Sequence, residues 1–274
     1  MKKTVLIFFL IVVGSTHCQI ALTDTIQILS WNVFLRPSIL KDRQLERVEA
    51  ITQHLIDKDA DILVLQEVFH KKSKKILINT LSKSYPFHTK EGKKSFWGIA
   101  SGVYIFCKDS ILSEKHVDFI SSSGTDALAK KGAVKIRIKR KNKEISVVGT
   151  HLQAGEGPKK NLIRKKQLEH LAKLNNEDVT LIYAGDFNIR KKSTHFNDLR
   201  EILDVKNLAS NYIETANFND QELFPVNGKP VWIDFILINQ HANAKFLNLN
   251  TKRPKSHGKF LSDHSPVYAE IIIN

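Results

Sequence analysis

Eight polar residues of three chemical types, acid, amide and imidazole, stand at the ends of apolar, strand-like runs of the sequence or, in one case, interrupt such a run. They are Asn32, Glu67, His151, Asp186, Asn188, Asp234, Asp263 and His264. A single polar residue at a strand end commonly caps a turn. Six such strand ends are harder to explain in that way, and a sheet gathers neighbouring strand ends at one edge, where ligand sites form. We therefore expect these eight side chains to meet at one site.

The carboxylates and amides of this set indicate a site for a hard divalent cation. Oxygen ligands without clustered cysteines select Mg²⁺, Mn²⁺ or Ca²⁺ over softer metals. The two imidazoles, His151 and His264, add groups that transfer protons and stabilise an oxyanion. A divalent cation beside phosphate oxygens neutralises charge and lowers the pKa of bound water. Together these residues predict metal-assisted attack of water on a phosphate ester.

Several other enzyme classes lack their signature residues in this sequence. There is no Gly-x-Ser-x-Gly turn for a serine hydrolase and no Gly-x-x-x-x-Gly-Lys-Ser/Thr loop for a P-loop nucleotidase. His-Glu-x-x-His and Cys-x-x-Cys are also absent. The Gly-rich stretch 155–158 follows His151 as an ordinary loop, and we assign it no phosphate-binding role.

The composition is that of a globular protein with a large positive surplus. Of 274 residues, 42% are hydrophobic and 26% charged, which excludes disordered, collagen-like and coiled-coil chains. Two cysteines exclude a disulfide framework. Lys and Arg number 42 against 28 Asp and Glu, a net charge of +14, which points to polyanions: nucleic acid, an acidic membrane surface or phosphorylated substrates.

The N-terminus has the pattern of a secretory signal peptide. Two lysines at positions 2 and 3 precede the apolar run Val5–Val13, and small residues lead to Cys18. We expect cleavage after Cys18, a secreted or periplasmic protein, and one domain over residues 19–274. Cys107 then has no disulfide partner, and its apolar surroundings predict a buried thiol.

The elements that must position the eight residues are mostly strands. Strand-like runs are Ile26–Trp31, Ile62–Leu65, Gly102–Cys107, Val134–Ile138, Ile145–Thr150, Val179–Ala184, Val231–Ile238 and Pro266–Ile273. Helical spacing appears at Leu45, Val48, Ile51 and Leu55, at Ile76, Leu77 and Leu81, and at Leu162, Leu168, Leu171 and Leu174. Two packed sheets with helices outside is the architecture that these elements predict.

Six short motifs occur in order and cover nearly all of residues 19–274. They are Ser30-Trp31-Asn32, Leu65-Gln66-Glu67, Gly149-Thr150-His151-Leu152, Gly185-Asp186-Phe187-Asn188, Ile233-Asp234-Phe235 and Ser262-Asp263-His264. In these motifs and their order the chain resembles the endonuclease/exonuclease/phosphatase superfamily. The resemblance implies a DNase I-like four-layer α/β sandwich, with two mixed, mostly antiparallel sheets packed face to face. It also implies Mg²⁺-dependent cleavage of phosphoester bonds.

The resemblance also implies a role for each residue. Metal ligands would be Glu67, Asn32, Asp263, Asp186 and Asn188, holding one or two ions of Mg²⁺, with Mn²⁺ or Co²⁺ as alternatives. The general base would be His264, oriented by Asp234. The nucleophile and phosphate would be positioned by Asp186 and Asn188, and His151 would donate to the phosphoryl oxygens.

A narrower resemblance is to secreted bacterial neutral sphingomyelinases. It rests on Leu65-Gln66-Glu67-Val68-Phe69, Tyr85-Pro86-Phe87, Ser101-Gly102-Val103, Lys131-Gly132, Gln153-Ala154, residues 32–37 and Arg47. It implies hydrolysis of sphingomyelin to ceramide and phosphocholine at a membrane surface, without an obligate protein partner. The chain departs from that branch at residues 248–260, which are short and basic where relatives carry an aromatic-tipped hairpin. Membrane contact would then depend on charge or on Phe96-Trp97.

Two other functions remain open on the sequence. The positive surplus is compatible with a secreted nuclease of the same superfamily, because Lys and Arg contacts to phosphates drive nucleic-acid binding. A non-catalytic basic binding protein would be expected to have broken catalytic motifs, and none of the six is broken.

Overall fold

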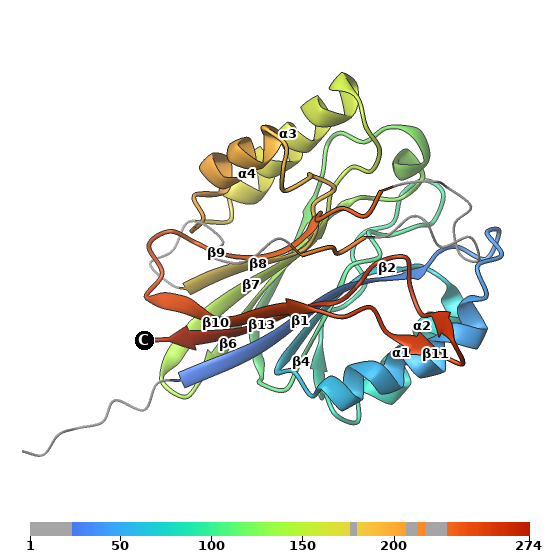
Figure 1. The fold of residues 1–274 in the computed structure, drawn as a ribbon, viewed down its shortest axis with the longest axis horizontal. Coiled ribbons are helices and arrows are strands. Elements are labelled where there is room, and N and C mark those ends of the chain that lie inside the picture. Colours follow the sequence, from blue (N-terminus) through green and yellow to red (C-terminus); the bar gives the residue numbers. More distant parts are fainter. Residues whose placement is uncertain (1–23, 176–179, 207–212, 217–228) are drawn as a thin grey trace, which may run out of the picture.

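The structure of the protein is a computed structural model that describes residues 24–175, 180–206, 213–216 and 229–274. Two sheets pack face to face, and helices cover their outer faces (Figure 1). Helices α1 and α2 lie on the sheet that contains β1 and β2, and α3 and α4 lie on the sheet that contains β7 and β8. This is the four-layer α/β sandwich expected from the sequence.

The first sheet has the strand order β10-β13-β1-β2-β4-β3, and the second has the order β5-β6-β7-β8-β9. The strands of the first sheet are β10 (Ala244–Thr251), β13 (Val267–Ile273), β1 (Asp24–Leu35), β2 (Ile62–Val68), β4 (Tyr104–Cys107) and β3 (Phe87–His88). Those of the second sheet are β5 (Ile111–Asp118), β6 (Gly132–Arg140), β7 (Lys143–His151), β8 (Thr180–Asp186) and β9 (Asp234–Ile238). Helices α1 to α4 span Gln44–Lys58, Lys71–Leu81, Pro158–Ala172 and His195–Leu203. A 3₁₀ helix, η1, spans Gly124–Leu128, and a short hairpin pairs β11 (Lys255–Ser256) with β12 (Lys259–Phe260). Among these described strands, only β1–β2 and β7–β8 run parallel.

Alternation along the strands builds three apolar layers. In β1, Ile26 and Ile28 face the opposite sheet, whereas Leu29 and Trp31 face α1 and α2. The same period sends Val134, Ile136 and Ile138 of β6 into the space between the sheets. The central strands thus bury both faces, which the sequence indicates through their nearly continuous apolar runs.

Some elements differ from the sequence expectation. Strand β1 continues past Trp31 to Leu35, and strands β5 and β10 and helix α4 were not expected. Strands β5 and β10 lie at sheet edges, and neither strand has a consistently buried face, so their sequences lack a clear apolar alternation.

Two expected helix faces were partly wrong. Leu45 and Leu162 are exposed rather than buried, with 47% and 56% of their surface accessible. In α1 the inward positions of the first turn belong to Gln44 and Arg47, which donate hydrogen bonds to loop carbonyls.

Two further expectations concern Cys107 and the signal peptide. Cys107 is fully buried in β4, as expected, and burial raises the pKa of its thiol to about 12. The predicted signal peptide, including Cys18, lies outside the described residues. Within the described part of the chain, no helix is long and apolar enough to cross a bilayer.

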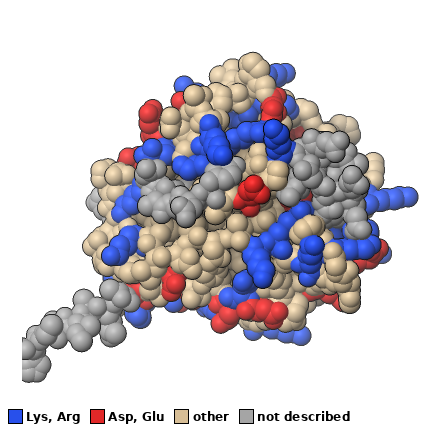
Figure 2. All heavy atoms as spheres, viewed as in Figure 1, with Lys and Arg blue, Asp and Glu red and all other residues tan. Residues whose placement is uncertain are grey.

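Positive charge is spread over the surface. On the face in Figure 2, Lys and Arg side chains form several groups separated by neutral surface. On this face the surplus therefore does not form one continuous basic stripe.

Gly185 allows β7 and β8 to approach closely. Its φ of +154° lies in a region that side chains rarely adopt, and a Cβ atom would stand 2.0 Å from the carbonyl oxygen of Thr150. The resulting register places His151 directly opposite Asp186. A backbone constraint thus sets the spacing of two polar residues predicted to be in the site.

Gly185→Ala is expected to destabilise the protein by about 3 kcal/mol, because the added methyl group meets backbone that has no room to move. Gly258→Ala is the matched control. Gly258 also has a positive φ, +77°, but has open space around it, so its cost should be about 1 kcal/mol. Urea unfolding gives both values, and equal costs for the two variants would contradict the steric argument.

Candidate active site

All eight polar residues predicted to form the site converge at one edge of the sandwich, where β1, β2, β7 and β8 end. We call it the site edge. Asp186 lies at its centre: its Oδ2 atom is 3.2 Å from Asn32 Nδ2, 3.4 Å from His151 Nε2 and 3.7 Å from His264 Nε2. The Oδ1 atom of the same carboxylate accepts a hydrogen bond of 2.9 Å from the backbone N–H of Asn188. The two sheets therefore share one buried carboxylate.

Asn32 connects that carboxylate to the other sheet. Its Nδ2 group also lies 3.2 Å from Glu67 Oε1, while its Oδ1 accepts a hydrogen bond from Phe34 N–H. Asn32 is 1% exposed, so water has almost no access to its amide and does not compete for these hydrogen bonds. One amide thus bridges an acid of β2 and an acid of β8.

His264 and Asp234 form a buried pair beside Asp186. The Nδ1 atom of His264 lies 2.9 Å and 3.1 Å from the two carboxylate oxygens of Asp234. Two backbone N–H groups, those of Ile233 and Asp234, donate to the hydroxyl of Thr215 and fix the start of β9. Such a pair sets the imidazole orientation and leaves Nε2 facing the carboxylate cluster.

The segment before His264 is tied to β1. Ser262 donates a hydrogen bond of 2.6 Å to the Asn32 carbonyl, and its hydroxyl oxygen accepts one from His264 N–H. Trp31 donates its indole N–H to the His264 carbonyl over 3.0 Å. These bonds hold Asp263 beside Glu67, although strand β13 begins only at Val267.

Arg47 of α1 supports the same region from beneath. It is 4% exposed and donates to the carbonyl groups of Asp42, Val33, Leu261 and Phe34. Burial lowers the pKa of its guanidinium to about 10. A single side chain therefore fastens the end of β1 to the residue that precedes Ser262.

Two of the site residues have left-handed backbone conformations. The φ angles are 59° at Glu67 and 52° at Asn188. Side-chain-bearing residues adopt this conformation at a cost of about 1–3 kcal/mol, and such strain clusters at functional sites. The fold thus maintains an unfavourable backbone in order to direct these two side chains.

The carboxylates repel one another in this buried setting. Burial and the charge of Asp263 raise the pKa of Glu67 to about 7, and its Oε2 atom is buried with no hydrogen-bond partner. Burial, with the charge of Asp186, also raises the pKa of Asp263.

The two histidines respond in opposite directions. Burial would lower the pKa of His264, but the negative charges of Asp234, Asp186 and Asp263 outweigh it and raise that pKa well above its usual value. Burial and the charge of Lys131 lower the pKa of His151 to about 3. His151 is therefore neutral, and its Nδ1 atom is buried without a partner.

Two functional positions carried no strong signal in the sequence. Thr215, which holds the start of β9, is an isolated residue far from any motif. Lys131 was indicated only as part of a motif shared with the sphingomyelinase branch. It is 3% exposed and lies 3.3 Å from Asp126, and its positive charge acts to lower the pKa of both Glu67 and His151.

The donor set fits a hard cation. Within the described residues, one group of ligand-type atoms lies within 4.8 Å of one another, from Asp186, Asp234 and His264. Since Asp234 and His264 already bond to each other, the carboxylates that could hold a cation are those of Glu67, Asp186 and Asp263. The pKa values of Glu67 and Asp263 are raised, and the Oε2 atom of Glu67 is buried without a partner, which is an environment that a divalent cation stabilises.

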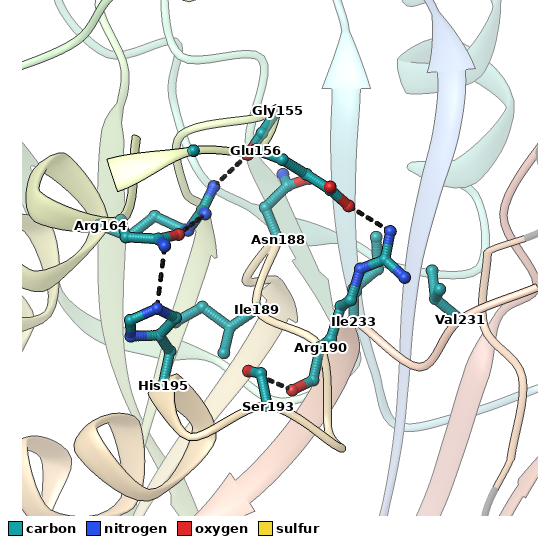
Figure 3. A pocket seen from close by; sticks show the side chains of 12 residues that line it. Gly155, Glu156, Arg164, Asn188, Ile189, Arg190, Ser193, His195, Val231 and Ile233 are labelled. Atoms are coloured by element: carbon teal, nitrogen blue, oxygen red, sulfur yellow. Dashed lines mark hydrogen bonds and ion pairs between the residues drawn. The ribbon is translucent and has the colours of Figure 1, made fainter. Parts of the chain in front are cut away.

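A cavity of about 330 Å³ opens beside this cluster (Figure 3). Of the eight residues only Asn188 lines it, and Glu156 and Arg190 form an ion pair in its wall. Gly155 and Gly157 also line it, and the Gly155 carbonyl accepts a hydrogen bond of 2.7 Å from Arg164. The Gly-rich loop, given no role from the sequence, therefore borders the site edge.

Comparison with known proteins shows relatives over most of the chain. Sphingomyelinase C 2 of Leptospira interrogans is 27% identical over 285 residues, which cover 89% of this chain and 45% of the relative. The chain thus spans about half the length of that relative. Phospholipase C of Staphylococcus aureus is 26% identical, with 89% and 86% covered.

Solved structures show the same fold at lower identity. SmcL gives a TM-score of 0.77 at 24% identity, covering 91% of this chain and 99% of the other. A Staphylococcus aureus beta toxin variant with bound magnesium ions gives 0.75 at 23%, covering 90% and 99%. A D. rerio TDP2 complexed with a single-strand DNA product gives 0.74 at 15%, covering 90% and 98%.

The family model described as the Endonuclease/Exonuclease/phosphatase family matches residues 29–264, a span that contains all eight site residues. With that match, and with the two-sheet sandwich that carries the residues, the chain belongs to the endonuclease/exonuclease/phosphatase family.

Proposed function

We propose that this protein is a secreted, Mg²⁺-dependent phosphodiesterase that hydrolyses sphingomyelin to ceramide and phosphocholine. The observation that carries the proposal is the His264–Asp234 pair, which directs an imidazole nitrogen at the carboxylate of Asp186 within the carboxylate cluster. The names of the relatives, sphingomyelinase C and phospholipase C, support a phospholipid substrate. Secretion is supported by the pattern of residues 1–18, and the catalytic domain would span residues 19–274.

The metal would be held by the carboxylates of Glu67, Asp186 and Asp263, with the amides of Asn32 and Asn188 beside them. The unpartnered Oε2 atom of Glu67 supports this assignment. Mg²⁺ suits oxygen donors, and one or two ions are compatible with five such groups. When bound, the cation would neutralise phosphate charge and lower the pKa of a coordinated water.

His264 would accept the proton of the attacking water. With Nδ1–H donated to Asp234, the Nε2 atom faces Asp186 across 3.7 Å. This nitrogen would accept the proton once a bound cation offsets the negative charges that raise the pKa of His264. The water oxygen forms a bond to phosphorus as the bond from phosphorus to the ceramide oxygen breaks. That oxygen takes up a proton from solvent and leaves as the alcohol, which balances the proton passed to His264. Asp186 and Asn188 would orient the water and the phosphate.

His151 and Lys131 would stabilise the charge that develops on the phosphoryl oxygens. Because its pKa is about 3, His151 is neutral and acts as a hydrogen-bond donor rather than as a cation. Positive charge comes instead from Lys131, which is held by Asp126 at 3.3 Å.

The nuclease alternative has less support. The likeness to TDP2, at 15% identity, concerns the fold alone. Plasmid DNA is therefore a comparison substrate in the first test below.

Sphingomyelin vesicles with Mg²⁺ should release phosphocholine, and His264→Ala and Asp234→Asn should each lower kcat/KM by about 10³-fold. His241→Ala is the matched control, because His241 is an exposed histidine whose ring lies 3.3 Å from Asp204, away from the site. Its activity should stay within about twofold. Plasmid cleavage by a protein that leaves sphingomyelin intact would contradict the proposal.

Mg²⁺ should raise the melting temperature by about 5 °C at saturating concentration, because the ion binds only the folded carboxylate cluster. In Glu67→Gln the shift should fall below about 1 °C, and the metal-free variant should be no less stable than the parent, since one repelling charge is removed. Glu144→Gln, which changes an exposed carboxylate of β7, should keep the full shift. Scanning fluorimetry measures all three proteins, and a full shift in Glu67→Gln would remove Glu67 from the ligand set.

A further inference from the structure

Phe96 and Trp97 lie side by side in solvent. Their exposed fractions are 95% and 65%, and the rings meet edge to face with centroids 5.5 Å apart. The other two tryptophans of the chain, Trp31 and Trp232, are 0% and 1% exposed. Adjacent large apolar side chains with this exposure mark an interaction surface.

The turn that carries these rings is fixed at its base. The N–H of Gly98 donates to the Ser95 carbonyl over 2.9 Å, and Gly98 has the positive φ of +75° that the turn requires. The Ser95 hydroxyl donates to the Leu128 carbonyl over 2.6 Å and accepts from Trp97 N–H. The rings are therefore presented by an ordered turn, so binding through them needs little further ordering.

This turn is anchored to the site edge on both sides. The carbonyl of Gly102, five residues beyond Trp97, accepts a hydrogen bond of 3.0 Å from Val68 N–H, directly after Glu67. Ile99 forms an isolated bridge with Ala129, two residues before the buried Lys131. The exposed rings thus stand on the same edge of the molecule as the candidate catalytic residues.

The residues around the rings combine apolar and positive character. Residues 90–97 contain three Lys and one Glu, and Lys93 and Lys94 directly precede the turn. Lys94 remains 56% exposed although it pairs with Glu91 at 3.2 Å. Leu128, 43% exposed, lies beside the turn. Aromatic rings next to lysines suit the interface of a phospholipid bilayer, where apolar rings enter and ammonium groups meet phosphates.

Phe260, another aromatic residue near the C-terminal part of the chain, is differently placed. The guanidinium carbon of Arg253 and the ammonium of Lys255 lie 3.8 Å and 4.3 Å from its ring centroid. Its ring is thus already engaged by cations, and it is only partly exposed.

We propose that Phe96, Trp97 and Leu128, together with Lys93 and Lys94, form a membrane-docking surface that enters the interfacial layer of a phospholipid bilayer. The surface would hold the site edge against the bilayer, so its purpose rests on the lipid substrate proposed above. The docking step itself requires no hydrolysis and is testable separately.

Binding is measured with the full chain carrying His264→Ala, so that the vesicles stay intact. Since Trp97 is the exposed tryptophan, sphingomyelin and phosphatidylcholine vesicles should shift its fluorescence to the blue, and brominated lipids should quench it. Adding Phe96→Ala and Trp97→Ala should raise the lipid concentration for half-maximal sedimentation by about 30-fold. Leu112→Ala is the matched control. Leu112 is 50% exposed but lies at the end of β5 that pairs with Ile138, whereas the other end pairs with Gly132 beside Lys131, so binding should not change.

Charge is tested with vesicles that also contain phosphatidylserine. They should bind the parent more tightly, and Lys93→Gln with Lys94→Gln should remove most of that gain. Unchanged vesicle binding by the Phe96→Ala, Trp97→Ala variant, or no quenching by brominated lipid, would overturn the docking surface. Self-association through these rings in place of lipid binding would overturn it as well.

Activity separates this proposal from the proposed function. With His264 intact, Phe96→Ala and Trp97→Ala should lower hydrolysis of vesicle sphingomyelin by about tenfold and leave hydrolysis of a short-chain, monomeric analogue unchanged. Vesicle hydrolysis that does not depend on the rings would overturn docking alone. Vesicle binding through the rings without hydrolysis by the parent protein would overturn the enzymatic function alone.

Discussion

The convergence of buried carboxylates at the site edge is the constraint on which the rest of the structure depends. Asp186 comes from one sheet and Glu67 from the other, and Asp263 arrives on the segment before β13. Burial and neighbouring negative charge raise the pKa values of Glu67 and Asp263, so the charges of the cluster must be compensated. Within the described residues the compensation comes from the Asn32 amide, His264 and Lys131, and it leaves one oxygen of Glu67 unpartnered. A divalent cation would complete the balance and also perform the chemistry.

The fold tolerates this cost because packing elsewhere is extensive. Three apolar layers separate the four layers of secondary structure, and the central strands are buried on both faces. That stability supports left-handed conformations at Glu67 and Asn188 and the close approach at Gly185. Arg47 adds hydrogen bonds to this packing, since its buried guanidinium donates to backbone carbonyls of three separate segments. Repulsion between carboxylates is thus tolerated at the site, where two side chains also depend on left-handed backbone.

The sequence predicted the central strands and the eight site residues because both depend on local patterns. Apolar runs ended by polar residues locate the strand ends, and sheet geometry brings those ends together. Thr215 and the role of Arg47 were not predictable, because each acts through long-range contacts to backbone groups and leaves no periodic signal. Edge strands β5 and β10 were not predicted for a different reason: neither has a consistently buried face, so the sequence shows no apolar repeat there.

On the face in Figure 2 the Lys and Arg side chains form separate groups, whereas the site edge contains the carboxylates of Glu67, Asp186, Asp234 and Asp263. The central claim is that water attacks phosphorus at that edge with His264 as the base. Hydrolysis of sphingomyelin in ¹⁸O-labelled water, followed by mass spectrometry of both products, tests it most directly. The account predicts one labelled oxygen in phosphocholine and none in ceramide. Label in ceramide would place the attack at carbon and contradict the account, and so would the absence of turnover.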